Sequence, residues 1–378
     1  MSFRLRLPNT PPLRPGRAAS CFPRIQTPQP HLSRLTPSRY LITTSDVTTT
    51  PDTSPTAATA AASQFLQSHS STILTRTQPL DAHHLQKLSL LLARPNLHPA
   101  LPITSSPPPD GTPLPKGYHL IYFTPSQLEA DLGADGTDTT FNAPWPFTRR
   151  MWAGGKMEWV RGRELRVGEA VEERSRVLSA VGKRGGDGRG MVLVEVEKVL
   201  EGKGGGLMRD VRSWIFRPPV EQSSERRVDP QLDAGRETTQ AKSTLVDVPG
   251  EDPEGFPERH MSWSPVALFG FSALTFNPHK IHYNESWTRN VEGHPGLVVH
   301  GPLNLINMLD YWRDVHGRRE RGLHLKEVKY RAMAPIYAGE QYRITSSVVE
   351  DGQEPRYELL VIKGDAICMR GEITAERS

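Results

Sequence analysis

Cysteine is scarce in this sequence, whose 378 residues include two, Cys21 and Cys368. Two cysteines provide no disulfide framework, and Cys368 lies in a short apolar stretch that predicts a buried side chain. No apolar run approaches the roughly 18 residues that a membrane-spanning helix needs, so we predict no membrane span. No glycine-rich loop stands between a strand and a helix, and we therefore predict no nucleotide or redox cofactor.

Acidic residues are absent from the first 45 positions, where seven arginines precede Asp46. The net charge of +4 comes from this segment, and the remainder is slightly acidic, so the charge gives no argument for a nucleic-acid partner. A segment rich in Arg, Ser and Thr and without Asp or Glu is typical of a mitochondrial presequence. Arg39-Tyr40-Leu41 is similar to a matrix-protease cleavage site. We predict import into the mitochondrial matrix, with a disordered basic tail as the alternative.

Proline and glycine, 34 and 31 residues, cluster in stretches that separate the folded parts. Residues 46–62 are mostly Thr, Ser, Ala and Pro, a composition typical of disorder. A helical pattern follows to about Leu92, interrupted by Pro79. The predicted divisions are a presequence at 1–45, a disordered and helical extension at 46–114, a strand-rich unit at 115–218, a linker at 219–258 and a second unit at 259–378.

Hydrophobic periodicity indicates the fold class of the two units. In the first unit, Val192, Val194 and Val196 alternate with other residues, as in a strand with one buried face. In the second, residues 303–312 form a short helix that is apolar on most sides, and such a helix is buried. Strands follow it to the end of the chain. One buried helix surrounded by antiparallel strands is the hotdog arrangement. We predict an α+β double hotdog in which the helix of the first copy is reduced.

The stretch from residue 271 to 303 contains the residues best suited to chemistry. His279 and His282 lie three apart in a polar loop. Further on, His300-Gly301-Pro302 opens the buried helix; glycine permits close approach of a ligand, and proline suits the first helical position. The free N–H groups at such a helix start are suited to a developing oxyanion.

This stretch resembles the MaoC-like hydratases, in particular the hydroxyacyl-thioester dehydratase type 2 branch and its mesaconyl-CoA-hydratase-like relatives. That family carries Thr-Gly-Asp-x-Asn-Pro-Leu-His and, later, Val-His-Gly at the start of the central helix. Thr275 and His282 match the family Thr and His, and Val299-His300-Gly301 matches the helix entry. Asn277 stands where the family has its catalytic Asp, and His279 where it has Asn. The resemblance covers the second unit strongly and residues 115–218 weakly.

The resemblance implies a division of roles in the dehydration of a 3-hydroxyacyl thioester. His282 is the expected base and acid, Asn277 positions the water, and Gly301 N–H stabilises the thioester oxyanion. An Asn cannot exchange a proton at neutral pH, so either His282 performs both proton transfers or His279 shares them. Thr275 is a further candidate, and His300 is expected to be mainly structural.

From these observations we predict a hydro-lyase, a 3-hydroxyacyl-thioester dehydratase of mitochondrial fatty-acid synthesis that acts on acyl carrier protein thioesters. One alternative is a hydratase of short dicarboxylic acyl-CoAs such as mesaconyl-CoA, which would need an Arg or Lys inside the pocket. Another is a non-catalytic acyl-thioester-binding protein, because the family Asp is absent. The predicted partner is an acyl thioester on acyl carrier protein or CoA, and a homodimer is left open.

Other features have both functional and ordinary interpretations. The four histidines at 279, 282, 294 and 300 lack a Cys or carboxylate at a recognised ligand spacing, so we predict no metal. His294 is expected to be an ordinary loop residue. A basic cluster after the buried helix could bind a pantetheine phosphate or an acidic carrier protein, or be a solvated turn; it comprises Arg318, Arg319, Arg321 and Lys326. Four tryptophans are expected to be mostly core or fold-edge residues, and some could line an acyl tunnel; they are Trp145, Trp152, Trp159 and Trp214.

Overall fold

The computed structural model describes residues 51–220, 242–250 and 255–378. The predicted presequence, residues 1–45, lies outside the described residues, as does most of the predicted linker. No helix among the described residues is long and apolar enough to cross a membrane.

Eleven strands of the described chain form one sheet, in the order β1-β5-β6-β7-β4-β10-β13-β12-β11-β9-β8. All neighbouring strands run antiparallel. The first half of the chain contributes β1 and β4 to β7, the second half contributes β8 to β13, and the two meet where β4 pairs with β10. Strands β2 and β3 form a separate two-stranded sheet. The order in the second half from β10 to β9 mirrors the order in the first half from β4 to β1. The mirrored halves are the two copies expected for a double hotdog.

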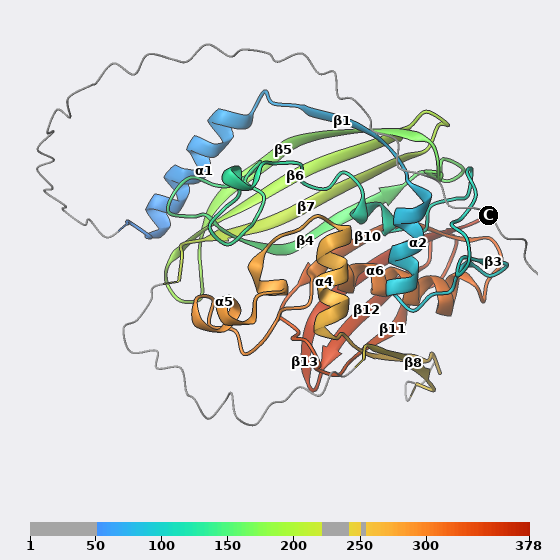
Figure 1. Ribbon diagram of the computed structural model, residues 1–378. Helices are drawn as coiled ribbons and strands as arrows, with labels where there is room; N and C mark the ends of the chain where they lie inside the picture. The colour runs from blue at the N-terminus through green and yellow to red at the C-terminus, as the bar shows by residue number, and fades with distance from the viewer. Residues whose placement is uncertain (1–50, 221–241, 251–254) are drawn as a thin grey trace, which may run out of the picture. The chain divides into compact units, whose positions relative to one another are not determined.

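The first half of the chain contains two helices, two 3₁₀ turns and the strands of its part of the sheet (Figure 1). They are α1 (Pro55–His69), β1 (Leu74–Pro79), α2 (Ala82–Leu91), β2 (Asn96–His98), β3 (Leu101–Pro102), the 3₁₀ turns η1 (Tyr118–Ile121) and η2 (Glu129–Asp131), β4 (Arg149–Trp159), β5 (Ala170–Arg184), β6 (Gly190–Gly202) and β7 (Leu207–Arg217).

The second half places its helices between β9 and β10. Its elements are β8 (Thr244–Val248), β9 (Glu258–Ser262), α4 (Pro265–Leu274), the 3₁₀ turn η3 (Lys280–His282), α5 (Glu285–Asn290), α6 (Gly301–Trp312), the π-helical turn η4 (Arg313–Gly317), β10 (Leu323–Ala332), β11 (Tyr342–Glu350), β12 (Arg356–Lys363) and β13 (Ala366–Arg377).

Helix α1 corrects the expectation of disorder over residues 46–62, because an ordered helix begins at Pro55. The Ser54 side chain accepts a hydrogen bond from Ala57 N–H, and Pro55 occupies the first turn, where proline is favoured. The alanine-rich face packs closely on β5 and β6 because Gly182 and Gly190 have no side chain. A Cβ on Gly190 would lie 2.4 Å from the Ser54 carbonyl oxygen.

Two other short strands differ from the sequence expectation. Residues 74–79 were expected within a helical pattern, but they form β1 and pair with β5. Their exposed and half-buried residues alternate in the manner of an edge strand. Within the expected linker, Thr244–Val248 forms β8 and pairs with β9. The division boundaries near residues 218 and 259 remain predictions.

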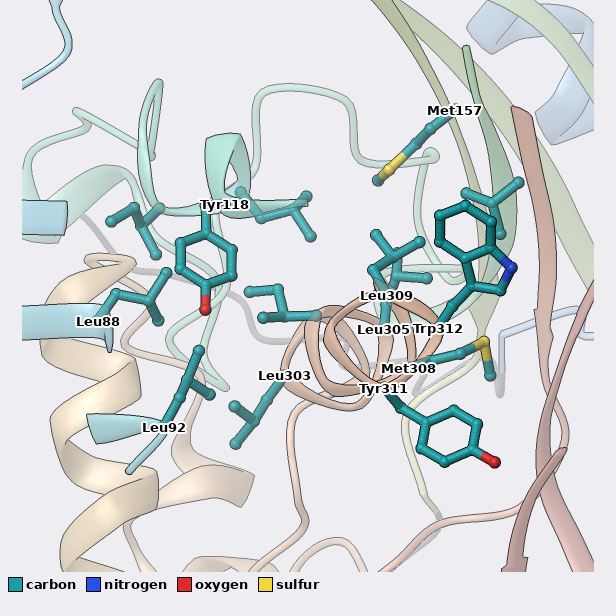
Figure 2. Packing of buried hydrophobic residues seen from close by; sticks show 14 of the residues in the cluster. Leu88, Leu92, Tyr118, Met157, Leu303, Leu305, Met308, Leu309, Tyr311 and Trp312 are labelled. Carbon is teal, nitrogen blue, oxygen red and sulfur yellow. The ribbon is translucent and has the colours of Figure 1, made fainter. Parts of the chain in front are cut away.

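Helix α6 is the centre of the larger hydrophobic cluster. All residues from Leu303 to Trp312 are buried, in agreement with the prediction of a helix that is apolar on most sides. Figure 2 shows side chains radiating from the helix in several directions: Leu303 lies on the side of Leu88 and Leu92, whereas Trp312 points the opposite way. The helix therefore holds the sheet and the preceding helices around one core, and its N-terminus is fixed in place.

Candidate active site

A cavity of about 750 Å³ lies between the two halves of the sheet and the loop before α6. In the second half, α6 contacts β11 and β12. In the first half, the fully described segment 92–148 contains only the short turns η1 and η2 as helical structure. The reduced helix of the first copy thus leaves part of the inward face of its strands free. Side chains from β4, β6 and β7 line the cavity together with the start of α6.

The loop after α4 carries Asn277 into the cavity. Helix α4 ends at Leu274, and the hydroxyl of the next residue, Thr275, donates to the Phe271 carbonyl at 2.8 Å and so caps the last turn. Phe276 then adopts φ 44°, a left-handed conformation that is unfavourable for a residue with a side chain. The Asn277 side-chain oxygen accepts from His279 N–H at 3.2 Å. Its amide nitrogen is thereby left as the group that can donate to a bound hydroxyl or water.

His282 is held in one tautomer. Its Nδ1 lies 2.7 Å from the Val298 carbonyl oxygen, which can only accept, so Nδ1 carries the hydrogen. The lone pair is then on Nε2. The ring lies in η3, is buried, and lines the cavity. A buried imidazole with a fixed tautomer and a free ring nitrogen is well arranged to accept a proton.

Both histidines of the loop are neutral at physiological pH. Burial lowers the pKa of His282 to about 3, helped by the neighbouring His279 and opposed by the hydrogen bond to Val298. Burial also lowers the pKa of His279 to about 3, and the positive charges of Arg150 and Arg149 add to the effect. His282 is therefore ready as a base without prior deprotonation.

His300 supports His282 from behind. The two rings stack with their centroids 3.6 Å apart, and His300 Nε2 lies 2.9 Å from the Ser272 hydroxyl. The His300 side chain is fully buried and does not line the cavity. Its position supports the structural role expected from the sequence.

Gly301 opens helix α6 at the cavity wall. A Cβ at this position would lie 3.2 Å from the indole of Trp152, closer than ordinary contact. Among the described residues no backbone carbonyl accepts from Gly301 N–H. The free N–H at a helix N-terminus is suited to negative charge on an oxygen.

The structure thus brings His282, Asn277, Gly301, His279 and Thr275 to one cavity. It also adds residues that the sequence did not suggest. Asp135, from the first half, places its carboxylate 3.7 Å from His279 Nε2. Asp135 is far from the histidines in sequence, so no local motif could have identified it.

His294, expected to be an ordinary loop residue, also lines the cavity and lies 3.3 Å from the Tyr337 hydroxyl. Three of the four tryptophans take the expected core or cavity-lining positions. Trp152 and Trp214 line the cavity, Trp159 lies in the core, and Trp145 is exposed.

The basic cluster after α6 does not line this cavity. Arg318 pairs with Asp314 at 3.2 Å and Lys326 with Glu354 at 2.6 Å, while Arg319 stacks over Phe256. These contacts favour a solvated turn over a binding site for a pantetheine phosphate or an acidic carrier protein.

Comparison with known proteins agrees with this arrangement. The model of the family Hydroxyacyl-thioester dehydratase type 2 matches residues 117–338. The chain belongs to this family. Mesaconyl-C(4)-CoA hydratase of Chloroflexus aurantiacus is 27% identical over 255 residues, which are 64% of this chain and 77% of that protein. The mitochondrial hydroxyacyl-thioester dehydratase type 2 of Schizosaccharomyces pombe is 26% identical over 258 residues, 62% of this chain and 78% of that protein.

Among solved structures, a MaoC-like dehydratase from Phytophthora capsici superimposes with a TM-score of 0.54 at 14% identity. The match covers 81% of this chain and 96% of that chain, and it supports the double hotdog fold. Membership of the dehydratase family identifies this protein as a hydro-lyase of the hydroxyacyl-thioester type, acting on an acyl thioester.

Proposed function

We propose that the cavity interconverts a 3-hydroxyacyl thioester and its trans-2-enoyl form, with His282 as the catalytic base. The observation that carries the proposal is the fixed tautomer of His282, whose free Nε2 lies in the same cavity as Gly301 N–H. Removal of the C2 proton requires a base, and the negative charge that develops on the thioester oxygen requires a donor.

The steps balance within this set of groups. His282 Nε2 takes the C2 proton while Gly301 N–H donates to the thioester oxygen. The C3–O bond then breaks, and the leaving hydroxyl takes the proton from His282 and departs as water. Asn277 donates from its amide nitrogen to that hydroxyl and holds it in place. His279, with Asp135 beside it, is the second group that can exchange a proton at this position.

The decrease in absorbance of an enoyl thioester during hydration tests the role of His282 directly. We expect wild-type protein to hydrate crotonyl-CoA or a longer trans-2-enoyl-CoA, and His282→Ala to reduce kcat by about 100-fold or more, as for loss of a general base. His260→Ala is the control, since that histidine is exposed on β9. Equal rates for wild type and His282→Ala would contradict the role of His282. Thioester binding without turnover by wild type would favour a binding protein.

The proposal includes the carrier and the compartment. The arginine-rich start of the chain and the mitochondrial dehydratase of Schizosaccharomyces pombe support action in the mitochondrial matrix on acyl carrier protein thioesters of fatty-acid synthesis. Import into isolated mitochondria, with a chain that begins at residue 41 as the control, tests the compartment. A higher kcat/KM for an enoyl carrier protein than for the same enoyl-CoA tests the carrier. A homodimer also remains a prediction, which light scattering of the purified protein can measure.

A second candidate is a hydratase of short dicarboxylic acyl-CoAs. It is favoured by one observation, the presence of Arg150, Lys198 and Arg212 in the cavity lining. The similarity to mesaconyl-C(4)-CoA hydratase agrees with it. Turnover of mesaconyl-C4-CoA in place of straight-chain enoyl thioesters would support this candidate over the first.

A further inference from the structure

A turn of the first half, residues 133–137, packs against the loop that carries the site histidines. Lys280 N–H of that loop donates to the Asp135 carbonyl oxygen at 2.8 Å. Gly136, at φ 85°, comes so close that a Cβ there would lie 2.1 Å from the Pro278 carbonyl oxygen. Glycine is favoured both by the left-handed conformation and by the short distance. Backbone contacts therefore fix the 133–137 turn relative to the histidine loop.

The Asp135 carboxylate is held in one orientation. Its Oδ1 accepts hydrogen bonds from the Thr137 N–H at 2.9 Å and from the Thr137 hydroxyl at 2.6 Å. Its Oδ2 is left to face His279, whose Nε2 lies 3.7 Å away. This separation is longer than a hydrogen bond, yet Nε2 is buried and has no other partner among the described residues. Catalytic hydrogen bonds often shorten when the substrate binds, so Oδ2 is the acceptor for an Nε2–H group.

The other ring nitrogen of His279 faces the cavity. Nδ1 makes no hydrogen bond within the described chain and, unlike Nε2, is not buried, and the ring lines the cavity. When Nε2 carries the hydrogen, the lone pair is on Nδ1. His282 has the opposite tautomer, with its hydrogen on Nδ1, and the two rings lie edge to face with their centroids 5.4 Å apart. Two neighbouring imidazoles would then each present a lone pair to the cavity.

The hydroxyl that leaves C3 needs an acceptor as well as a donor. Asn277 donates to its oxygen from the amide nitrogen, but the Asn277 side-chain oxygen already accepts from His279 N–H at 3.2 Å. His282 is engaged in taking and returning the C2 proton. The group left to accept the hydrogen of the hydroxyl is His279 Nδ1. That role requires the hydrogen of the His279 ring to be on Nε2, and the tautomer of an imidazole is set by the hydrogen bond that its other nitrogen makes.

We propose that Asp135 is a positioning residue, which accepts from His279 Nε2–H and so keeps His279 Nδ1 as the acceptor for the C3 hydroxyl. The first half thereby supplies a carboxylate, which Asn277 does not provide, and this carboxylate acts through His279. Asp135 itself exchanges no proton and contacts no substrate. The inference rests on the proposed function for the hydroxyl that His279 contacts, whereas the tautomer of His279 depends only on the protein.

The tautomer can be measured without turnover, by ¹⁵N NMR of the full chain with labelled histidine rings. The His279 signals are those lost in His279→Gln, and we expect Nε2 to be protonated in wild type. In Asp135→Asn the two Thr137 donors should keep the amide oxygen, so that the amide nitrogen faces Nε2 and can only donate. Nε2 must then accept, and the hydrogen should move to Nδ1. The control is Asp131→Asn, a change at an exposed acid of η2, which should leave the wild-type tautomer.

Hydration rates show whether the tautomer matters for the reaction. Asp135→Asn should lower kcat by about 10-fold or more, the size usual for loss of a group that orients a reacting histidine, with KM little changed. Asp131→Asn should keep the wild-type kcat. Asp135→Glu keeps a carboxylate and should retain both the Nε2–H tautomer and most of the rate, which a role in packing alone would not produce.

Three results would each overturn the inference: an Nδ1–H tautomer in wild type, an unchanged Nε2–H tautomer in Asp135→Asn, or a reversed tautomer with a wild-type kcat. If Asp135→Asn does not fold, wild type and Asp135→Glu decide the question by the same two measurements. An Nε2–H tautomer that depends on Asp135, in a protein that hydrates no enoyl thioester, would leave the positioning of His279 in place and contradict the proposed function instead.

Discussion

Burial keeps His279 and His282 uncharged, and on the proposed function this determines the pH range in which the site can work. A histidine in water has a pKa of about 6.5 and loses its capacity as a base in mildly acidic solution. His282, with its pKa lowered to about 3, keeps its free Nε2 across that range.

We therefore predict a kcat/KM that is level from neutral pH down to about pH 5, because the acidic limb of kcat/KM reports the base of the free enzyme. Initial rates of hydration over that range, in buffers of constant ionic strength, measure it. A limb with an apparent pKa near 6.5 would show that the base is a solvated histidine and not His282.

Asn277 offers a second test at the residue scale. In Asn277→Asp a carboxylate would lie in the cavity that contains His282, and a nearby negative charge favours the imidazolium form. The pKa of His282 should rise, and the acidic limb of kcat/KM should move toward neutral pH. Asn277→Ala, which adds no charge, should lower the rate without moving the limb. The same displacement in both variants would argue against a charge effect.

At this scale the motif predicted which residues of the second half share a cavity, since His282, Asn277 and Gly301 do so. It could not predict Asp135 beside His279 or Arg150 in the cavity lining, because both come from the first half and are brought there by the tertiary fold. Lys198 had a usable signal: it stands in the apolar phase of Val192 to Val196 on β6. A lysine at an inward-facing strand position indicates either that the buried face ends there or that the charge has a function.

Among the elements, the long strands follow from alternation and α6 from its apolar sides. The short strands β1 and β8 were not predicted, and α1 does not follow from composition. Its Ala, Ser and Thr residues have little apolar area, and the helix is ordered because it packs closely on the sheet at Gly182 and Gly190. That complementarity is visible only when the helix and the strands are seen together.

Gly190→Ala should therefore destabilise the protein by about 1–3 kcal/mol, the usual effect of overpacking. The added methyl group would lie 2.4 Å from the Ser54 carbonyl oxygen and 2.8 Å from the Ala58 Cβ. Urea unfolding measures the change. Gly186→Ala, in the turn before β6, is the control, since nothing lies within 4 Å of its added Cβ. Similar midpoints for Gly190→Ala and wild type would mean that α1 is not tightly held.

For the whole molecule, the double hotdog follows from the two sets of strands and the one buried helix. The joining of β4 to β10 and the mirrored strand order were not deducible, because hydrophobic periodicity gives the faces of strands but not their neighbours.

Buried neutral histidines also affect the stability of the fold. His279 and His282 have a pKa of about 3 when folded, below the value of about 6.5 in an unfolded chain. Between these values the unfolded state binds more protons, so stability is lost as the pH falls through this window. At pH 5.5 the loss is on the order of 1 kcal/mol for each histidine relative to neutral pH.

His279→Gln should reduce this acid sensitivity, since Gln does not titrate. The free energy of unfolding, measured by urea titration at pH 7.5 and 5.5, should fall less in the variant than in wild type. The exposed His260 gives the control, His260→Gln. An identical decrease in His279→Gln and wild type would mean that His279 is already charged in the folded protein.

Because the first copy has no long helix, the residues assigned to the reaction and the residues that surround the acyl group lie in different parts of the chain. Residues after Thr275 hold the groups assigned to bond making and breaking, while Arg150, Trp152, Arg212 and Trp214 shape the space into which the acyl group extends. A mutation in the first half can therefore alter which acyl group is bound without altering the residues that carry out the reaction. A duplicated ancestor with this arrangement could acquire new substrates by drift in its first copy, while selection preserved the chemistry of the second.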